Sequence, residues 1–212
     1  MSLELSNVSL IAPGAEAAMF APLSLSVAPG ETVCVMGPSG VGKSSLIAHI
    51  GGHLPRGFRT TGTITLDGRD LGALPAEKRG VGVLFQDAQL FAHLSVGDNL
   101  AFGLRAELRG RTARRKAVAK ALEQAGLAGF EARDPATLSG GQRMRVALMR
   151  ALLAQPRAIL IDEAFARLDT GLREDIRAFV LSHIAASAIP ALMVSHDEQD
   201  ALAADRVVHL GR

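Results

Sequence analysis

A short run of residues near the start of the chain has the types and spacing of a phosphate-binding loop. It fits the pattern G-x-x-x-x-G-K-[ST] and consists of Gly37, Pro38, Ser39, Gly40, Val41, Gly42, Lys43 and Ser44. In such a loop the glycines let backbone N–H groups surround a β-phosphate, the lysine reaches the β- and γ-oxygens, and the hydroxyl ligates Mg²⁺. The alternative interpretation is a glycine-rich turn between a strand and a helix.

The residues on either side of this loop have the patterns of a strand and a helix. Thr32–Met36 is an apolar run typical of a buried strand, and Ser45–Ile50 has helical character. A strand, a glycine-rich loop and a helix, in this order, form the context in which the motif binds phosphate. We therefore count Ser45, at the start of the helix, among the expected nucleotide contacts.

Two carboxylates follow another apolar run later in the chain. Ala158–Ile161 reads as a buried strand, and Asp162 and Glu163 come directly after it. Ligands of open α/β sheets bind beside the carboxyl ends of the strands. Behind a phosphate-binding loop, this pair predicts that Asp162 holds Mg²⁺ and that Glu163 orients or polarises an attacking water.

A third motif lies where a helix is expected to begin. It consists of Leu138, Ser139, Gly140, Gly141 and Gln142, and a helical pattern follows to residue 154. Ser139 suits the N-cap position, and the two glycines leave backbone N–H groups uncovered, which predicts an anion site. A capped helix start is the alternative, and it accounts for Ser139 but not for the Gly-Gly-Gln that follows.

Composition excludes several classes of protein. With 48% hydrophobic residues the chain is globular, its formal charge of +2 is too small to indicate a nucleic-acid partner, and its single cysteine, Cys34, falls in an expected core strand. No apolar run approaches the ~18 residues of a membrane span, and the first residues lack a secretion signal, so we expect a cytoplasmic protein.

Basic residues concentrate in one stretch of the middle of the chain. They are Arg105, Arg109, Arg111, Arg114, Arg115, Lys116 and Lys120. Apolar residues at helical spacing occupy the opposite face, so we interpret the stretch as the solvated face of a helix rather than a nucleic-acid patch. Contact of this basic stretch with acidic lipid head groups is a further alternative.

The order of the patterns along the chain predicts an α/β fold. Residues 1–30 alternate apolar and polar, as in antiparallel strands, and the part from about 87 to 155 is rich in helical periodicity. Strands then alternate with helices from Ala158 to Leu210, which implies a parallel sheet covered by helices.

Taken together, the phosphate-binding loop, the Asp162–Glu163 pair and the Leu138–Gln142 pentapeptide resemble the ATP-binding cassette (ABC) ATPases, over essentially the whole chain. The resemblance implies an ATPase that uses ATP and Mg²⁺. It implies a single domain over residues 1–212 with a P-loop NTPase core and an N-terminal antiparallel β subdomain in residues 1–86 and 156–212. An inserted α-helical subdomain is expected at residues 87–155.

The resemblance assigns roles to three further residues. Gln86 matches the Q-loop glutamine that reaches the metal and the water, Asp169 matches the D-loop aspartate, and His196 matches the switch histidine that contacts the γ-phosphate. With them, the expected catalytic residues are Lys43, Gln86, Glu163 and His196, and the expected metal ligands are Ser44, Gln86 and Asp162. Family members pair head to tail, so the pentapeptide of one copy is expected to contact the γ-phosphate held by the other in an ATP-dependent homodimer.

The sequence lacks several features that mark other classes of ABC ATPase, and this indicates which kind of cassette it resembles. The stretch from Gln86 to Leu138 has no room for a long coiled-coil insertion, Glu131–Thr137 does not resemble the exporter loop, and the chain stops at Arg212 without a regulatory domain. These features are similar to short ATPase subunits of thiamine-, sulfate- and iron-type importers. Phe85–Phe91 and Asp134–Leu138 favour a thiamine-like branch.

The resemblance also implies partners. Transmembrane permease subunits are expected to dock near Gln86 to Leu104, a solute-binding protein acts indirectly, nucleic acid is not expected as a partner, and the chain works at the cytoplasmic face of the membrane. Export, lipoprotein extraction and a soluble non-transport role are the alternatives. Permease and binding-protein genes beside this gene would favour import.

Two departures from the family pattern carry expectations of their own. Ala164 and Ala166 stand where the family commonly has proline and serine, which predicts a looser D-loop and weaker dimer closure. The family's adenine-stacking aromatic is missing from Leu10–Gly14, the chain has no Tyr or Trp, and the nearest aromatic, Phe20, comes later. We expect the triphosphate to carry most of the affinity, with poor discrimination between ATP and GTP.

Overall fold

The computed structural model describes residues 1–211, whose contacts divide into two compact units. The first, here called the sheet unit, comprises Met1–Val83, Arg157–Glu163 and Leu181–Arg212, of which Arg212 lies outside the described residues. The second, the helical unit, comprises Leu84–Pro156 and Ala164–Val180. This division by contacts assigns residues 164–180 to the helical unit, whereas the sequence analysis places them in the P-loop NTPase core. The domain boundaries expected from the sequence therefore stay a prediction.

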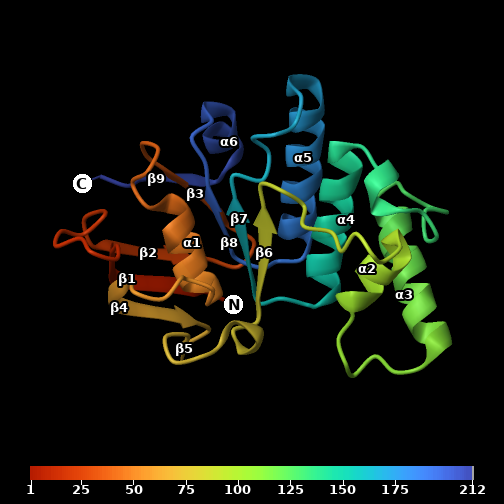
Figure 1. The fold of residues 1–212 in the computed structure, drawn as a ribbon, viewed down its shortest axis with the longest axis horizontal. Helices are drawn as coiled ribbons and strands as arrows, with labels where there is room; N and C mark the ends of the chain where they lie inside the picture. Colours follow the sequence, from red (N-terminus) through yellow and green to blue (C-terminus); the bar gives the residue numbers. More distant parts are fainter. Residues whose placement is uncertain (212) are drawn as a thin grey trace. The chain divides into compact units, whose positions relative to one another are not determined.

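A five-stranded sheet forms the centre of the α/β part, as the alternating patterns predict (Figure 1). In spatial order its strands are β6 (Val81–Phe85), β7 (Ala158–Asp162), β8 (Ala191–Val194), β3 (Thr32–Met36) and β9 (Arg206–His209). The pairs β7–β8, β8–β3 and β3–β9 are parallel. Nearly all side chains of β3, β7 and β8 are buried, which explains their unbroken apolar runs.

The N-terminal strands form a second, antiparallel sheet, also as predicted. Its spatial order is β2 (Leu23–Val27), β1 (Leu3–Ile11), β4 (Arg59–Leu66) and β5 (Arg69–Asp70). In β2, buried and exposed residues alternate strictly, because one face packs on the core and the other meets water. The pairing of β1 shifts register around Asn7, whose φ of 51° is left-handed.

Helices complete the sheet unit. The helix α1 (Lys43–Gly51) packs against β7 and β8, and α6 (Glu198–Ala203) packs against β3, while η1 (Ala76–Lys78) is a single 3₁₀ turn. Side chains of α1 are buried in one core together with those of both sheets. This packing fixes the helix that follows the phosphate-binding loop.

The helical unit is built from α2 (Val96–Phe102), α3 (Arg111–Gln124), η2 (Pro135–Thr137), α4 (Gly140–Leu153) and the greater part of α5 (Thr170–Ala186). The helices α3 and α4 overlap the two helical patterns predicted from the sequence, and α2 packs on both. Fully buried Asn99 holds the segment before α2, because its amide donates to the carbonyls of Phe91, Leu94 and Ser95.

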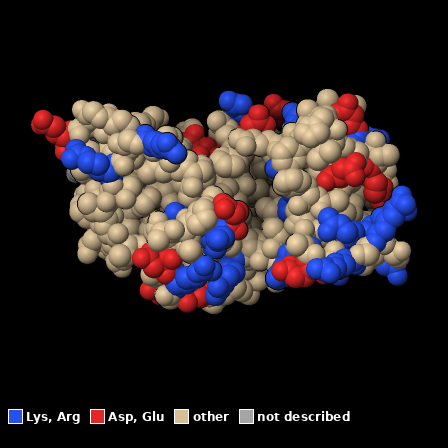
Figure 2. All heavy atoms as spheres, turned by 60° about the horizontal axis from the view of Figure 1, so that its bottom comes forward, with Lys and Arg blue, Asp and Glu red and all other residues tan. Residues whose placement is uncertain are grey.

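The basic stretch lies largely on the exposed side of α3. Figure 2 shows Lys and Arg side chains gathered over the region that holds α3, with acidic side chains among them. Val118, Ala121 and Leu122 are buried on the other side of this helix. Arg114 donates to the carbonyls of Ala101 and Leu108, so part of the positive charge has a local structural role.

Two expectations about single features can be checked in the described residues. Cys34 is fully buried in β3, and burial raises the pKa of its thiol to about 12, which suits a core residue rather than a reactive one. Within residues 1–211, every helix is too short or too polar to cross a membrane.

Candidate active site

The phosphate-binding loop joins β3 to α1 and ends at two glycines with left-handed backbone. Gly40 has φ 79° and Gly42 has φ 109°, conformations that residues with a Cβ adopt only under strain. Gly42 is also the N-cap of α1, where no side chain caps the helix and its first turn holds no acidic residue. The positive end of α1 is therefore open to an anion.

Lys43 is almost completely buried beneath this loop, with 5% of its surface exposed. Its Nζ donates to the carbonyl oxygens of Gly37 at 2.7 Å and Pro38 at 3.2 Å. A buried ammonium requires such partners. The loop thus holds a positive charge at its centre, where a phosphate would bind.

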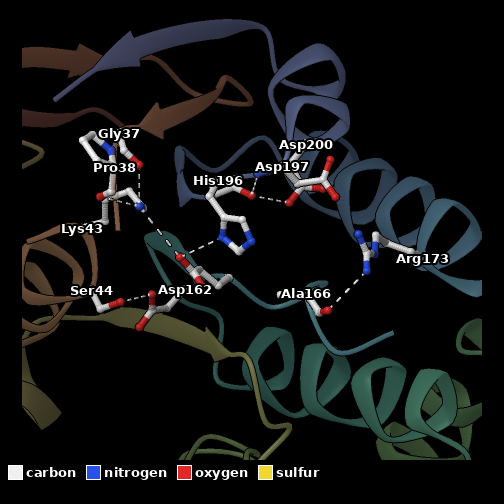
Figure 3. Close-up of polar contacts among 12 residues, drawn as sticks. Gly37, Pro38, Lys43, Ser44, Asp162, Ala166, Arg173, His196, Asp197 and Asp200 are labelled. Carbon is white, nitrogen blue, oxygen red and sulfur yellow. Dashed lines mark hydrogen bonds and ion pairs between the residues drawn. The ribbon is translucent and has the colours of Figure 1, made fainter. Parts of the chain in front are cut away.

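Ser44 and Asp162 lie together, although they are far apart in the sequence (Figure 3). The Ser44 hydroxyl donates to Oδ1 of Asp162 over 2.8 Å. Burial raises the pKa of Asp162 above its ordinary value and the nearby charge of Glu163 adds to this, while the bond from Ser44 opposes it. A hydroxyl and a carboxylate side by side provide the hard oxygen ligands that Mg²⁺ prefers.

Glu163 lies at the end of β7 between two cationic or protonatable groups. Its Oε1 is 3.3 Å from Nδ1 of His196 and 4.0 Å from Nζ of Lys43. The backbone N–H of Glu163 donates to the carbonyl of Val194, and its φ of 47° is left-handed. The predicted residues Lys43, Ser44, Asp162, Glu163 and His196 therefore gather at one edge of the parallel sheet.

A buried pair that the motif search did not find holds the loop that carries His196. The hydroxyl of Ser195 donates to Oδ2 of Asp200 over 2.6 Å and accepts the backbone N–H of Asp197 at 3.0 Å (Figure 3). Ser195 and Asp200 are 2% and 3% exposed. No sequence signal marks this pair, because a serine and an aspartate five positions apart form it only once the loop folds.

Lys43, Ser44 and Glu163 border a hollow of about 170 Å³ beside the phosphate-binding loop. Its lining consists of Met19, Gly40, Gly42, Lys43, Ser44, Ser45 and Glu163. Met19 comes from the connection between β1 and β2 and was missed from the sequence, because no short motif includes it. Apart from Met19, the lining is polar, charged or glycine.

The pentapeptide lies in the helical unit and begins α4. Ser139 is the N-cap: its hydroxyl accepts the N–H of Gln142 at 3.2 Å, and the Gln142 side chain accepts the N–H of Ser139 at 3.0 Å. Leu138, 3% exposed, is buried before this capping box. The capped helix start therefore accounts for Gln142 as well as Ser139, which corrects our argument that it could not.

Packing gives Gly141 a second local role. A Cβ at this position would lie 2.9 Å from Cδ1 of Leu172 and 3.1 Å from Cδ1 of Ile176, both on α5. A Cβ at Gly140 would meet only Leu168, at 3.3 Å. Close approach of α4 and α5 thus requires glycine at Gly141 more than at Gly140.

The remaining predicted residues also lie in the helical unit. Gln86 directly follows β6 and is half-buried, and Asp169 is exposed just before α5. The guanidinium of Arg173 donates to the carbonyl of Ala166 (Figure 3) and to that of Leu168, which holds the segment before Asp169. Their roles at a nucleotide stay predictions.

Comparison with known proteins agrees with these motifs. The sequence pattern of the ABC transporter family matches residues 20–166. The chain is 48% identical over 206 residues to the uncharacterized ABC transporter ATP-binding protein YnjD of Escherichia coli, covering 97% of this chain and 94% of that protein.

Two named import ATPases are also similar. The sulfate/thiosulfate import ATP-binding protein CysA of Mycobacterium bovis is 42% identical over 88% of this chain, which spans only 53% of that relative. The thiamine import ATP-binding protein ThiQ of Jannaschia is 42% identical over 84% of this chain and 76% of its own length. The P-loop fold, the site motifs and these similarities agree, and the chain belongs to the ATP-binding, ATP-hydrolysing proteins of the ABC transporter family.

Proposed function

We propose that this protein is the ATPase subunit of a bacterial importer for a small solute. It acts as a head-to-tail dimer bound to transmembrane permease subunits at the cytoplasmic face of the membrane. The observation that carries the proposal is the cluster of Lys43, Ser44, Asp162, Glu163 and His196, of which Lys43, Ser44 and Glu163 line the hollow beside the phosphate-binding loop.

The sheet unit supplies the groups that would hold the nucleotide and its metal ion. The N–H groups at the start of α1 and the Lys43 ammonium bind the β- and γ-phosphates, and Ser44 and Asp162 ligate Mg²⁺. The ion neutralises charge on the phosphates. Within residues 1–211, no group of three or more His, Cys, Asp or Glu side chains is arranged to hold a metal ion by itself, which suits an ion held by few protein ligands, water and phosphate.

In this proposal Glu163 and His196 position the reacting groups, and Glu163 also accepts a proton. Glu163 orients the attacking water and accepts its proton, and its contact with His196 keeps the carboxylate directed into the site. His196 contacts the γ-phosphate. Phosphoryl transfer requires mainly positioning and charge stabilisation, so the buried Ser195–Asp200 pair contributes by fixing the His196 loop.

The dimer completes the site in this proposal. Ser139, Gly140 and Gly141 begin a helix whose positive end suits the γ-phosphate bound to the other copy. We assign Asp169 to the same interface as part of this proposal. ATP then holds two copies together and hydrolysis releases them, a switch biased by one phosphate group.

An exposed aromatic side chain supports permease docking within Gln86 to Leu104. Phe102 is 68% exposed, and its ring packs edge to face on Phe91 with centroids 4.7 Å apart. An exposed large aromatic on a surface helix is typical of a protein interface. The import direction rests on the named relatives, and no observation favours the export alternative.

Co-purification tests the proposal. The chain is expressed with the permease encoded beside its gene, and we expect Phe102→Glu to reduce capture by the permease without changing ATP binding. Leu202→Glu is the matched control, because Leu202 is 77% exposed but lies on α6 in the sheet unit. Equal loss of capture in both variants, or in neither, contradicts the docking site.

A further inference from the structure

Arg150, near the end of α4, contacts the segment between β6 and α2 within the helical unit. Its Nη1 donates to the carbonyl of Gln89 at 3.0 Å, and its Nη2 donates to that of Ala88 at 3.3 Å. The guanidinium carbon also lies 5.2 Å from the ring centroid of Phe91, which is within the range of a cation–π contact. One side chain of α4 thus holds residues 88–91 by their backbone and by a ring.

The backbone of this segment is strained at Gln89. Its φ of 45° is left-handed, an uncommon conformation for a residue that has a Cβ. Such a conformation persists only where the surroundings impose it. Burial lowers the pKa of Arg150 below its ordinary value, because its charge has lost water, and the Gln89 carbonyl is one of the partners that replace this water. Arg150 is therefore part of what holds the strained segment in place.

The same segment is tied to α2 and to an exposed ring. The Asn99 side chain accepts the N–H of Phe91 at 2.8 Å and donates to its carbonyl at 3.1 Å. Nη1 of Arg150 reaches the same Asn99 oxygen at 3.4 Å. Phe91 packs edge to face on Phe102, the exposed ring that we assign to the permease contact. A continuous set of contacts therefore runs from Arg150 through Phe91 to the surface.

The helix that carries Arg150 begins at the pentapeptide. Ser139 caps the first turn of α4 (Gly140–Leu153), and Arg150 lies about 16 Å further along the axis, at about 1.5 Å per residue. Several side chains between them are buried, namely those of Met144, Val146, Ala147, Leu148 and Met149. Close-packed elements transmit displacement because their interiors are hardly compressible. A movement of α4 at the pentapeptide therefore reaches the contacts of Arg150.

We propose that Arg150 is a positioning residue that transmits closure of the pentapeptide on ATP to residues 88–91, and so to the surface that binds the permease. When α4 moves toward a γ-phosphate, the guanidinium moves with it and pulls on or releases the carbonyls of Ala88 and Gln89. The strained backbone at Gln89 then takes a second, relaxed arrangement. The inference rests on the proposed function, since it needs ATP-dependent dimer closure, and adds the residue that links closure to the permease side.

The test follows this segment through a thiol placed at its end. Ala92→Cys introduces a thiol at an exposed position, and the natural Cys34 does not compete because it is fully buried and its pKa is raised to about 12. The full chain also carries Glu163→Gln, so that ATP is bound and not consumed. The rate of reaction with a maleimide is measured with and without ATP and Mg²⁺, and we expect ATP to change it several-fold.

Substitutions of two arginines on α4 then separate transmission from general loosening. Arg150→Met removes the charge and the donors but keeps a long side chain. We expect it to form ATP-dependent dimers in sedimentation and to lose most of the ATP-dependent change in labelling rate. Arg150→Lys keeps the charge without the planar guanidinium and should retain part of the change.

Arg145→Met is the matched control, because Arg145 makes the same kinds of contact elsewhere in the helical unit. Its guanidinium donates to the carbonyl of Ala125 at 3.0 Å and lies 4.9 Å from the ring centroid of Phe179. These contacts do not involve residues 88–91. We therefore expect Arg145→Met to keep the full ATP-dependent change in labelling rate.

Four results would overturn the role of Arg150. They are a labelling rate that ATP leaves unchanged although the chain dimerises, a full change in Arg150→Met, an equal loss in Arg145→Met, and a loss of dimerisation in the Arg150 variants, which would assign this residue to closure itself. If Arg150→Met does not fold, an undiminished change in Arg150→Lys has the same force. A chain with Arg150 intact that forms no ATP-dependent dimer contradicts the proposed function instead.

Discussion

The two units of the molecule use their motif residues differently. In the sheet unit, side chains of the motifs contact one another: Ser44 bonds to Asp162, and Glu163 lies between Lys43 and His196. In the helical unit the motif side chains are engaged in local structure, since Ser139 and Gln142 form a capping box with backbone groups. The sheet unit thus holds a preassembled set of reactive groups, whereas the pentapeptide offers mainly backbone N–H groups.

This difference has a consequence for how each unit responds to substitution. Reactive side chains that are already in contact contribute directly to chemistry, so changing one alters turnover more than folding. Residues that cap a helix or allow two helices to approach act first on stability. Variants in the two units should therefore separate activity from stability.

Replacing Glu163 is the strongest test of the sheet unit. We expect Glu163→Gln to keep ATP binding and to lower turnover by about 10²- to 10⁴-fold, because water activation is lost while phosphate and metal contacts remain. The same variant should accumulate as an ATP-dependent dimer on gel filtration. Glu174→Gln, an identical exchange at an exposed carboxylate of α5, should change neither quantity. Wild-type turnover in Glu163→Gln would remove Glu163 from the catalytic role.

Ser195 tests whether a buried support in the sheet unit also acts on turnover. Ser195→Ala removes the hydroxyl that bonds to Asp200 and Asp197, so the His196 loop loses its fixed position. We expect kcat to fall about ten- to hundredfold with little change in the KM for ATP. Ser187→Ala, which removes an exposed hydroxyl bonded to the His183 carbonyl, is the control. A fall in thermal stability with unchanged kcat would assign Ser195 a purely structural role.

Glycine substitutions in the helical unit test the opposite behaviour. Gly141→Ala places a Cβ within 3 Å of Leu172, which should destabilise the fold by about 1–3 kcal/mol in urea unfolding. Gly140→Ala, adjacent in the sequence, meets only Leu168 at 3.3 Å and should cost clearly less. ATP binding by the isolated chain should be the same in both. A larger loss of stability in Gly140→Ala would contradict the packing role of Gly141.

The sequence predicted the parts of the site that are set by local spacing. The phosphate-binding loop and the Asp162–Glu163 pair follow buried strands, so their place at the carboxyl edge of the parallel sheet could be inferred. The fold class followed from the same alternation of apolar runs and helical patterns. Met19, and the contact of Ser195 with Asp200, could not be inferred, because they depend on how loops fold onto one another.

Local spacing also misled in one place. The Gly-Gly-Gln of the pentapeptide looked unexplained by helix capping, yet Gln142 completes the capping box and Gly141 lies against Leu172 of α5. The approach of α4 to α5 is a tertiary feature that a single sequence does not reveal. A motif residue can therefore have a packing role and a ligand role at the same position.

The smallest expected effect concerns the segment before Asp169. Nη2 of Arg173 donates to the carbonyls of both Ala166 and Leu168, and Arg173→Lys replaces this planar guanidinium with a compact ammonium. These bonds hold the backbone before Asp169 and do not involve a reacting group. We therefore expect ATP binding by the single chain to be unchanged. ATP-dependent dimerisation should weaken about two- to fivefold, consistent with about 0.5–1 kcal/mol for such a bond.

The matched control for this change lies in the same unit. Arg114→Lys removes guanidinium bonds to the carbonyls of Ala101 and Leu108, which belong neither to the pentapeptide nor to the segment before Asp169. Both variants should lose thermal stability, since each gives up bonds to backbone carbonyls. Sedimentation with ATP in the Glu163→Gln background then separates them: only Arg173→Lys should weaken the dimer. If both variants dimerise equally, the helical unit acts on closure through its overall stability alone, and the segment before Asp169 has no separate part in it.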